Sequence, residues 1–131
     1  MERLLNLPCE KPEMYGPAAL AFMGDCVFDM LVREMLVSRG SCPAKKLHNE
    51  AVTMVNCAAQ AHAVGIIEPM LTEKEADVLR RGRNHATSHT PKNATGADYH
   101  KATGLECLFG YLYLCGNIER LRELFTAIYK D

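Results

Sequence analysis

The stretch that most constrains this chain runs from residue 19 to residue 32 and reads ALAFMGDCVFDMLV. It is apolar on nearly every side of a helix, yet it contains the acid Asp25 directly after Gly24. A helix that is hydrophobic all round belongs in the centre of a domain or in a membrane. Asp29 and Arg33 interrupt the run too soon for a membrane-spanning segment. We therefore expect a core helix whose embedded carboxylate is protonated, paired with a cation or bound to a metal.

A second stretch, residues 102 to 114 (ATGLECLFGYLYL), has the same character and contains the single acid Glu106. If these two helices pack together, Asp25 and Glu106 could share one cation. A buried acid can equally pair with a basic side chain of its own fold. The candidates for that pairing are Arg33, Arg81 and Lys101. The spacing alone leaves both interpretations open.

Length and composition predict one folded domain, residues 1–131, because 48% of the side chains are apolar and no segment is of low complexity. None of the six cysteines forms a Cys-x-x-Cys pair, and three lie inside apolar helical patterns. We interpret these three as small buried hydrophobes, and we expect neither disulfides nor structural zinc. The first residues include no apolar signal region. Both observations predict a cytoplasmic protein that does not enter a membrane.

The charge of the chain is uneven although its net value is −1. The segment from Arg80 to Lys101 has five lysines and arginines against one acid, Asp98, so the remainder of the chain is acidic. A basic segment on an acidic protein indicates a polyanionic partner. A solvated loop with a chance excess of arginine is the alternative.

Helix signals follow one another along the chain without any sustained strand alternation. Pro17 suits a first helical turn, Thr72 and Glu75 form a capping box, and Asn117 can cap the last helix. Residues 84–96 lack apolar periodicity and are predicted to form a long exposed loop. The fold class is therefore all-α with about five to six helices. The expected ranges are about 17–38, 43 to between 65 and 69, 72 to between 82 and 84, 98–115 and 117 onward.

The two acidic stretches resemble the two motifs of ribonuclease III. Ala-Leu-Ala-Phe-Met-Gly-Asp25 is similar to the Leu-Gly-Asp signature helix of that family, and Thr-Gly-Leu-Glu106-Cys-Leu-Phe-Gly-Tyr-Leu-Tyr-Leu is similar to its second acidic helix. Their order and separation also match. With Arg-Arg-Gly-Arg-Asn at 80–84, Tyr-His-Lys-Ala-Thr-Gly at 99–104 and one further helix before the end, the chain resembles the mini-ribonuclease III subfamily. That subfamily lacks the double-stranded-RNA-binding domain.

Two positions depart from the pattern of full-length ribonuclease III. A glutamate lies four residues before the signature aspartate in that family, and here the position is Ala21. An aspartate lies three residues before the second-helix glutamate, and here the position is Thr103. The reduced acidic set resembles that of the mini subfamily, and a decayed site is the alternative. The number of bound metal ions stays open.

The resemblance implies a ribonuclease III-like domain that hydrolyses double-stranded RNA with Mg²⁺ held by Asp25 and Glu106. It further implies a role in maturation of the 23S ribosomal RNA precursor, where a ribosome or ribosomal protein could take part. The expected RNA-contacting residues are Arg80, Arg81, Arg83, Lys92 and Lys101. For Lys101, a salt bridge to Glu106 or an ordinary surface position is equally open. Asp29 lies one turn beyond Asp25 on the same helix face; joining the site is one role open to it, and we expect a salt bridge to Arg33 instead.

Cutting both strands of a duplex requires two sites, and the family resemblance implies a homodimer whose contact is the signature helix. Apolar residues suited to that contact, with ordinary core as the alternative for each, are Phe22, Met23, Val27 and Met30. A different class of function is also open: a non-catalytic RNA-binding or ribosome-assembly protein on the same scaffold, which the two missing acids favour. A helical protein-interaction module without nucleic acid is a third interpretation.

Overall fold

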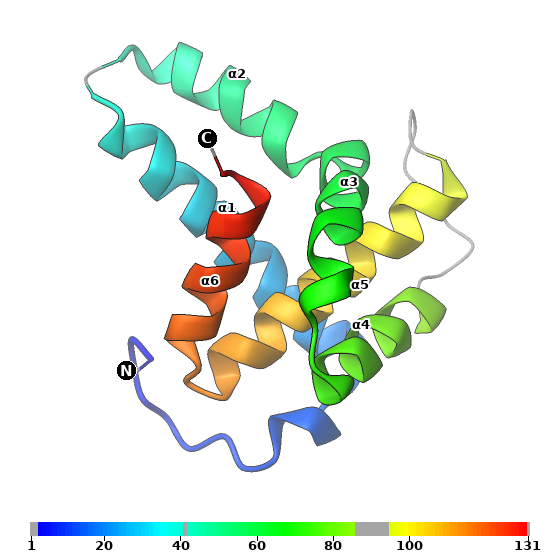
Figure 1. The fold of residues 1–131 in the computed structure, drawn as a ribbon. Helices are drawn as coiled ribbons and strands as arrows, with labels where there is room; N and C mark the ends of the chain where they lie inside the picture. The colour runs from blue at the N-terminus through cyan, green and yellow to red at the C-terminus, as the bar shows by residue number, and fades with distance from the viewer. Residues whose placement is uncertain (1–2, 41, 86–94, 131) are drawn as a thin grey trace.

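The computed structural model describes residues 3–40, 42–85 and 95–130, and this part of the chain contains six α-helices and no strand (Figure 1). The all-α prediction is thereby confirmed. Two short 3₁₀ helices, η1 and η2, complete the described secondary structure. The elements are η1 (Pro12–Met14), α1 (Pro17–Ser38), α2 (Ala44–Val55), α3 (Cys57–Ile67), η2 (Glu68–Met70), α4 (Glu73–His85), α5 (Gly96–Leu114) and α6 (Ile118–Ile128).

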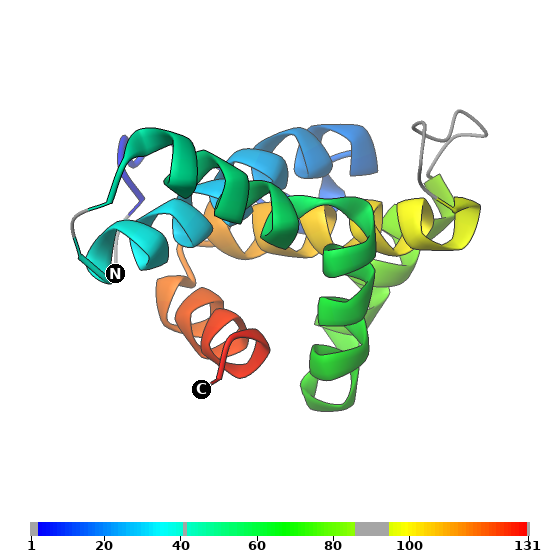
Figure 2. The same cartoon turned by 90° about the horizontal axis from the view of Figure 1, so that it is seen from above.

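Helix α5 is the centre of the molecule, and α1, α3, α4 and α6 all pack against it. Figures 1 and 2 show α5 crossing the middle of the fold in both views. Nine of its nineteen residues are buried, which agrees with its lack of a polar face. Beside it, Phe28 of α1 is fully buried and meets the rings of Phe109 and Phe125 edge-on at 5.2 and 5.8 Å. The two apolar stretches that dominate the sequence are thus the two central helices.

Glycines bring α1 and α5 into backbone contact. A Cβ atom added to Gly24 would lie 1.6 Å from the carbonyl oxygen of Glu106. A Cβ atom on Gly110 would lie 2.1 Å from the carbonyl oxygen of Leu20. No side chain fits at either crossing point, so only glycine permits this approach. The same device joins α4 to α5, where Gly82 faces Gly104.

The prediction of a single helix from residue 43 onward is wrong, because this segment forms two helices, α2 and α3, that are separated at Asn56. Asn56 takes an extended conformation, with φ −71° and ψ 165°, and its side chain accepts a hydrogen bond of 2.8 Å from the amide of Ala59. Asparagine is a strong N-cap, so it stabilises a helix start where apolar periodicity predicted continuation. Helix α3 then passes through Gly65 and ends at Ile67.

The capping box is confirmed: the amide of Thr72 donates to Glu75 at 2.9 Å, and the amide of Glu75 donates to the Thr72 hydroxyl at 3.2 Å. The same Glu75 carboxylate accepts from Arg120 at 2.9 Å, which ties the start of α4 to α6. Both side chains are largely buried. Of the predicted loop, residues 86–94 lie outside the described residues, while α4 extends to His85 and α5 begins at Gly96. In the described ranges we find no helix that combines the length and apolarity needed to span a membrane.

Candidate active site

The carboxylates of Asp25 and Glu106 lie next to each other where α1 crosses α5. Asp25 is exposed near the N-terminal third of α1, and Glu106 is partly buried in the middle of α5. They are close enough for the charge of Asp25, and a hydrogen bond with it, to act on Glu106. Gly24 precedes Asp25 and contacts the Glu106 backbone directly. The close helix crossing is therefore what brings together two acids 81 positions apart in the sequence.

The electrostatics of the pair are unfavourable without a cation. Burial, and after it the charge of Asp25, together raise the pKa of Glu106 to about 8. No ion pair to either acid occurs among the residues that the structure describes. A pair of carboxylates in this condition holds a shared proton or binds a cation.

None of the basic side chains considered as partners forms an ion pair with Asp25 or Glu106 in the described ranges. Arg33 pairs with Asp29 at 2.8 Å, as predicted from their spacing. Arg81 donates to the backbone carbonyls of Glu13 and Tyr15 at 2.8 and 3.2 Å, and so fixes the segment before α1 onto α4. Lys101 is partly buried and has no carboxylate within 4 Å in the described ranges.

A hard divalent cation fits this pair of acids. Mg²⁺ prefers oxygen ligands and is commonly bound by one or two carboxylates, with water and phosphate oxygens supplying the rest. Over the described part of the chain there is no cluster of three or more His, Cys, Asp or Glu side chains arranged for a metal. Thr103 does not replace the family acid, because its hydroxyl donates to the carbonyl of Tyr99 at 2.9 Å. Ala21 offers no ligand atom. The protein thus contributes two carboxylates at this place.

The start of α3 lies near Glu106, which the sequence did not reveal. Cys57 begins α3, and burial raises the pKa of its thiol, with the charges of Glu106 and Asp98 acting in the same direction. Its thiol therefore lies near Glu106 and Asp98 and is only partly buried, whereas the sequence suggested an ordinary core residue. The signal that could have found it is Asn56, whose preference for the N-cap ends α2 at this point.

Three of the arginines and lysines predicted to contact RNA have surface positions. Arg80 pairs with Asp77, and Arg83 lies 3.5 Å from Glu68, both in partly exposed contacts. Such exposed pairs are weak and can be exchanged for phosphate contacts. Lys101 lies on α5 five residues before Glu106. Lys92 lies outside the described residues.

The apolar residues proposed for a dimer contact divide into two groups. Phe22 is 84% exposed and Met30 is 42% exposed on α1, whereas Met23 is partly buried. Val27 is only 2% exposed and belongs to the core of the monomer. Of the four residues, Phe22 and Met30 are therefore on the surface of α1, where the predicted contact requires them.

Comparison with known proteins gives the class of the chain. Residues 18–117 match the family model of the Ribonuclease III domain, and this range includes both acids of the site. The fold, the facing carboxylates and this match define a ribonuclease III-type nuclease domain. A solved crystal structure of a Fusobacterium nucleatum protein supports the fold, with a TM-score of 0.84 and 24% identity, covering 93% of this chain and 98% of the other.

Relatives of known name narrow the class. A Mini-ribonuclease 3 of Symbiobacterium thermophilum is 45% identical over 116 residues, covering 88% of this chain and 89% of the relative. A Mini-ribonuclease 3 of Streptococcus pneumoniae is 44% identical over 109 residues, covering 81% and 84%. The chain belongs to the ribonuclease III family, and to its mini-ribonuclease III branch.

Proposed function

We propose that this protein is a Mg²⁺-dependent endoribonuclease that hydrolyses phosphodiester bonds in double-stranded RNA. The observation that carries the proposal is the contact between Asp25 and Glu106, two acids without a basic partner in the described ranges at the crossing of α1 and α5. An acid pair of this kind costs stability, so a fold that retains it has a use for it.

Asp25 and Glu106 are the proposed metal ligands. A bound Mg²⁺ supplies Lewis-acid stabilisation of the phosphate and a more acidic water. The side chains of this chain then hold the ion, orient the phosphate beside it and stay ionised at working pH. The raised pKa of Glu106 means that its proton must leave when the ion binds. Arg80, Arg83, Lys92 and Lys101 are the proposed phosphate contacts that position the duplex, and Arg81 acts mainly through the segment it fixes.

Further parts of the proposal concern assembly and biological role. One acid pair cuts one strand, so we propose a homodimer that presents two sites, with exposed Phe22 on α1 at its interface. The proposed substrate is the 23S ribosomal RNA precursor, processed in the cytoplasm, where a ribosomal protein can shape the RNA. The subfamily resemblance supports these points.

A second candidate function is RNA binding without cleavage, and the residues at Ala21 and Thr103 favour it. Incubation of the protein with a labelled RNA duplex and Mg²⁺ separates the two candidates. The enzyme hypothesis predicts cleavage that Asp25→Asn and Glu106→Gln each reduce at least about a hundredfold, with duplex binding retained. Binding without cleavage in either Mg²⁺ or Mn²⁺ would instead establish the second candidate.

A further inference from the structure

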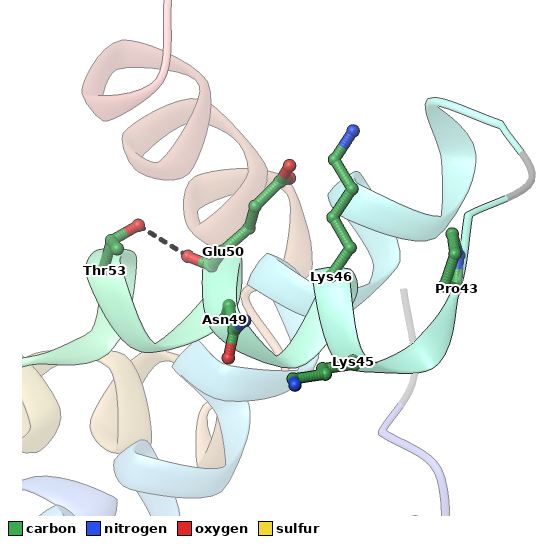
Figure 3. Close-up of a pocket in the computed structure, with 6 residues that line it drawn as sticks. All are labelled: Pro43, Lys45, Lys46, Asn49, Glu50 and Thr53. Atoms are coloured by element: carbon green, nitrogen blue, oxygen red, sulfur yellow. Dashed lines mark hydrogen bonds between the residues drawn. The ribbon is translucent and has the colours of Figure 1, made fainter.

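The outer side of α2 is polar and open, and it contains neither acid of the active site. Ala51 faces the core, while the opposite side forms a shallow hollow (Figure 3). We call this side the α2 face. Its residues are Pro43, Lys45, Lys46, Asn49, Glu50 and Thr53.

Two lysines occupy the end of α2 that is least suited to positive charge. Lys45 and Lys46 lie in the first turn, which has no acidic residue, and the N-cap Pro43 provides no side-chain cap. The N-terminus of a helix bears partial positive charge, so cations there oppose the helix dipole. Helices α4, α5 and α6 place acids in their first turns, as the dipole favours. A local choice that disfavours the helix indicates a functional demand.

The two ammonium groups are free to bind an anion. Arg33, Arg80 and Arg83 each have a carboxylate within 4 Å, whereas neither lysine does among the described residues. Glu50 extends from the same side of α2 as Lys46 but forms no ion pair with it (Figure 3). The Thr53 hydroxyl donates to the carbonyl of Glu50, and so is satisfied within its own helix. The end of the α2 face at Lys45 and Lys46 thus carries two positive charges without an ion-pair partner in the described ranges.

The α2 face leads away from the acid pair. Helix α2 ends at Val55, and two residues later the thiol of Cys57 lies near Glu106. Figure 2 shows α2 alongside α1, with the start of α3 against α5. At a rise of about 1.5 Å per residue, Lys45 and Lys46 lie roughly 15 Å along the helix from this junction. A duplex bound at the acid pair extends well past that distance on either side.

We propose that Lys45 and Lys46, with Asn49 beside them, bind the sugar-phosphate backbone of the RNA duplex away from the bond that is cut. This inference rests on the proposed function and adds a second contact region to it. Phosphate contacts of this type fix register and orientation and do not read sequence. They also release counterions, so each contact steepens the salt dependence of binding.

The test uses two double variants that remove equal charge. Lys45→Gln/Lys46→Gln removes the proposed contacts, and Lys11→Gln/Lys130→Gln is the matched control, since Lys11 precedes η1, Lys130 follows α6 and both are exposed outside the proposed RNA-contacting residues. Both are made on the Asp25→Asn background, and binding to a labelled RNA duplex is measured from low to high salt. The first variant is expected to bind about tenfold more weakly near physiological salt. Its slope of log K against log [salt] should be shallower than that of the parent, by roughly 1 to 2 in magnitude. The control should match its parent.

This inference would be overturned if the two double variants had equal salt slopes while the parent binds the duplex. The proposed function would stay intact in that case, provided that the wild type cleaves. Absence of duplex binding by the parent and of cleavage by the wild type would overturn both. The melting temperature provides a further check, because removing the lysines from the first turn of α2 should leave it unchanged or raise it. A lower melting temperature would mean that the lysines serve stability, and would count against the inference.

Discussion

Gly24 lies directly against the backbone of Glu106, so that even one methyl group at Gly24 would come within 1.6 Å of the Glu106 carbonyl oxygen. Because Asp25 is the next residue, the position of its carboxylate depends on this contact. The glycine of the Gly-Asp motif and the acid that follows it therefore act together: one allows the two helices to touch, and the other uses the resulting proximity.

The variant Gly24→Ala is expected to separate α1 from α5 and to lose both stability and activity. Overpacking of a core costs roughly 1–3 kcal/mol, and a clash with backbone belongs at the upper end. Urea denaturation measures the change. The control is Gly65→Ala, because Gly65 lies in α3 with nothing within 4 Å of its added Cβ. That variant should gain about 0.5–1 kcal/mol from helix propensity. Equal stability of Gly24→Ala and wild type would contradict the proposed contact.

The raised pKa of Glu106 predicts a stability that falls as pH rises. The folded pKa of about 8 exceeds the ordinary value of 4.5, so between these pH values the native state holds a proton that the unfolded state has released. In the absence of divalent metal, the contribution of Glu106 to the free energy of unfolding should be greatest below pH 4.5. It should decline toward pH 8 by up to about 1.4 kcal/mol per unit. Glu106→Gln should flatten this part of the profile and be more stable than wild type at pH 7.5. An unchanged profile would refute the interpretation.

The fold class and both acidic helices could be predicted from the sequence because each is a long apolar run interrupted by a single acid. The break at Asn56 escapes a prediction based on apolar periodicity, because that periodicity continues through it and only the N-cap preference of Asn56 marks it. The arginines show a similar limit. Arg81 belongs by composition to a basic segment, but its donors reach the backbone of Glu13 and Tyr15, residues distant in the chain. The sequence shows that Arg81 belongs to a basic segment, but only the folded structure shows which groups its guanidinium contacts.

Added Mg²⁺ should stabilise the protein by relieving the repulsion between the two acids. A ligand at 100 times its dissociation constant stabilises the native state by about 2.7 kcal/mol. We expect a concentration-dependent rise in melting temperature for wild type that EDTA reverses. Asp25→Asn should lose most of this rise, since one metal ligand is gone and the repulsion between the two carboxylates is gone with it. A rise of the same size in the variant would place the metal elsewhere.

The buried pair of Glu75 and Arg120 should control the stability of the α4–α6 contact. Burial alone would raise the pKa of Glu75, but the hydrogen bonds from Arg120 and Thr72 hold it below its usual range. This stabilisation is therefore present at neutral pH and is lost as pH falls below the ordinary value for glutamate, toward the lower folded pKa. Arg120→Gln leaves the Glu75 carboxylate buried and unpaired, which costs roughly 3–5 kcal/mol. Denaturation at pH 7 measures this loss. The exposed pair of Asp29 and Arg33 is the control, and Arg33→Gln should cost less than about 1 kcal/mol.

The exposed ring of Phe22 tests the proposed dimer. Phe22 lies on α1 three residues before Asp25, so an interface there would place the acid pair beside the partner chain. Wild type should sediment at about twice 14.6 kDa, the mass of one chain. Phe22→Glu brings a charge into the proposed apolar contact and should sediment as a monomer with an unchanged far-UV spectrum. Ile66→Glu changes a 37% exposed apolar residue on α3 and should leave the dimer intact. A wild type that stays monomeric at micromolar concentration would exclude the dimer, and each chain would then cut a single strand at a time.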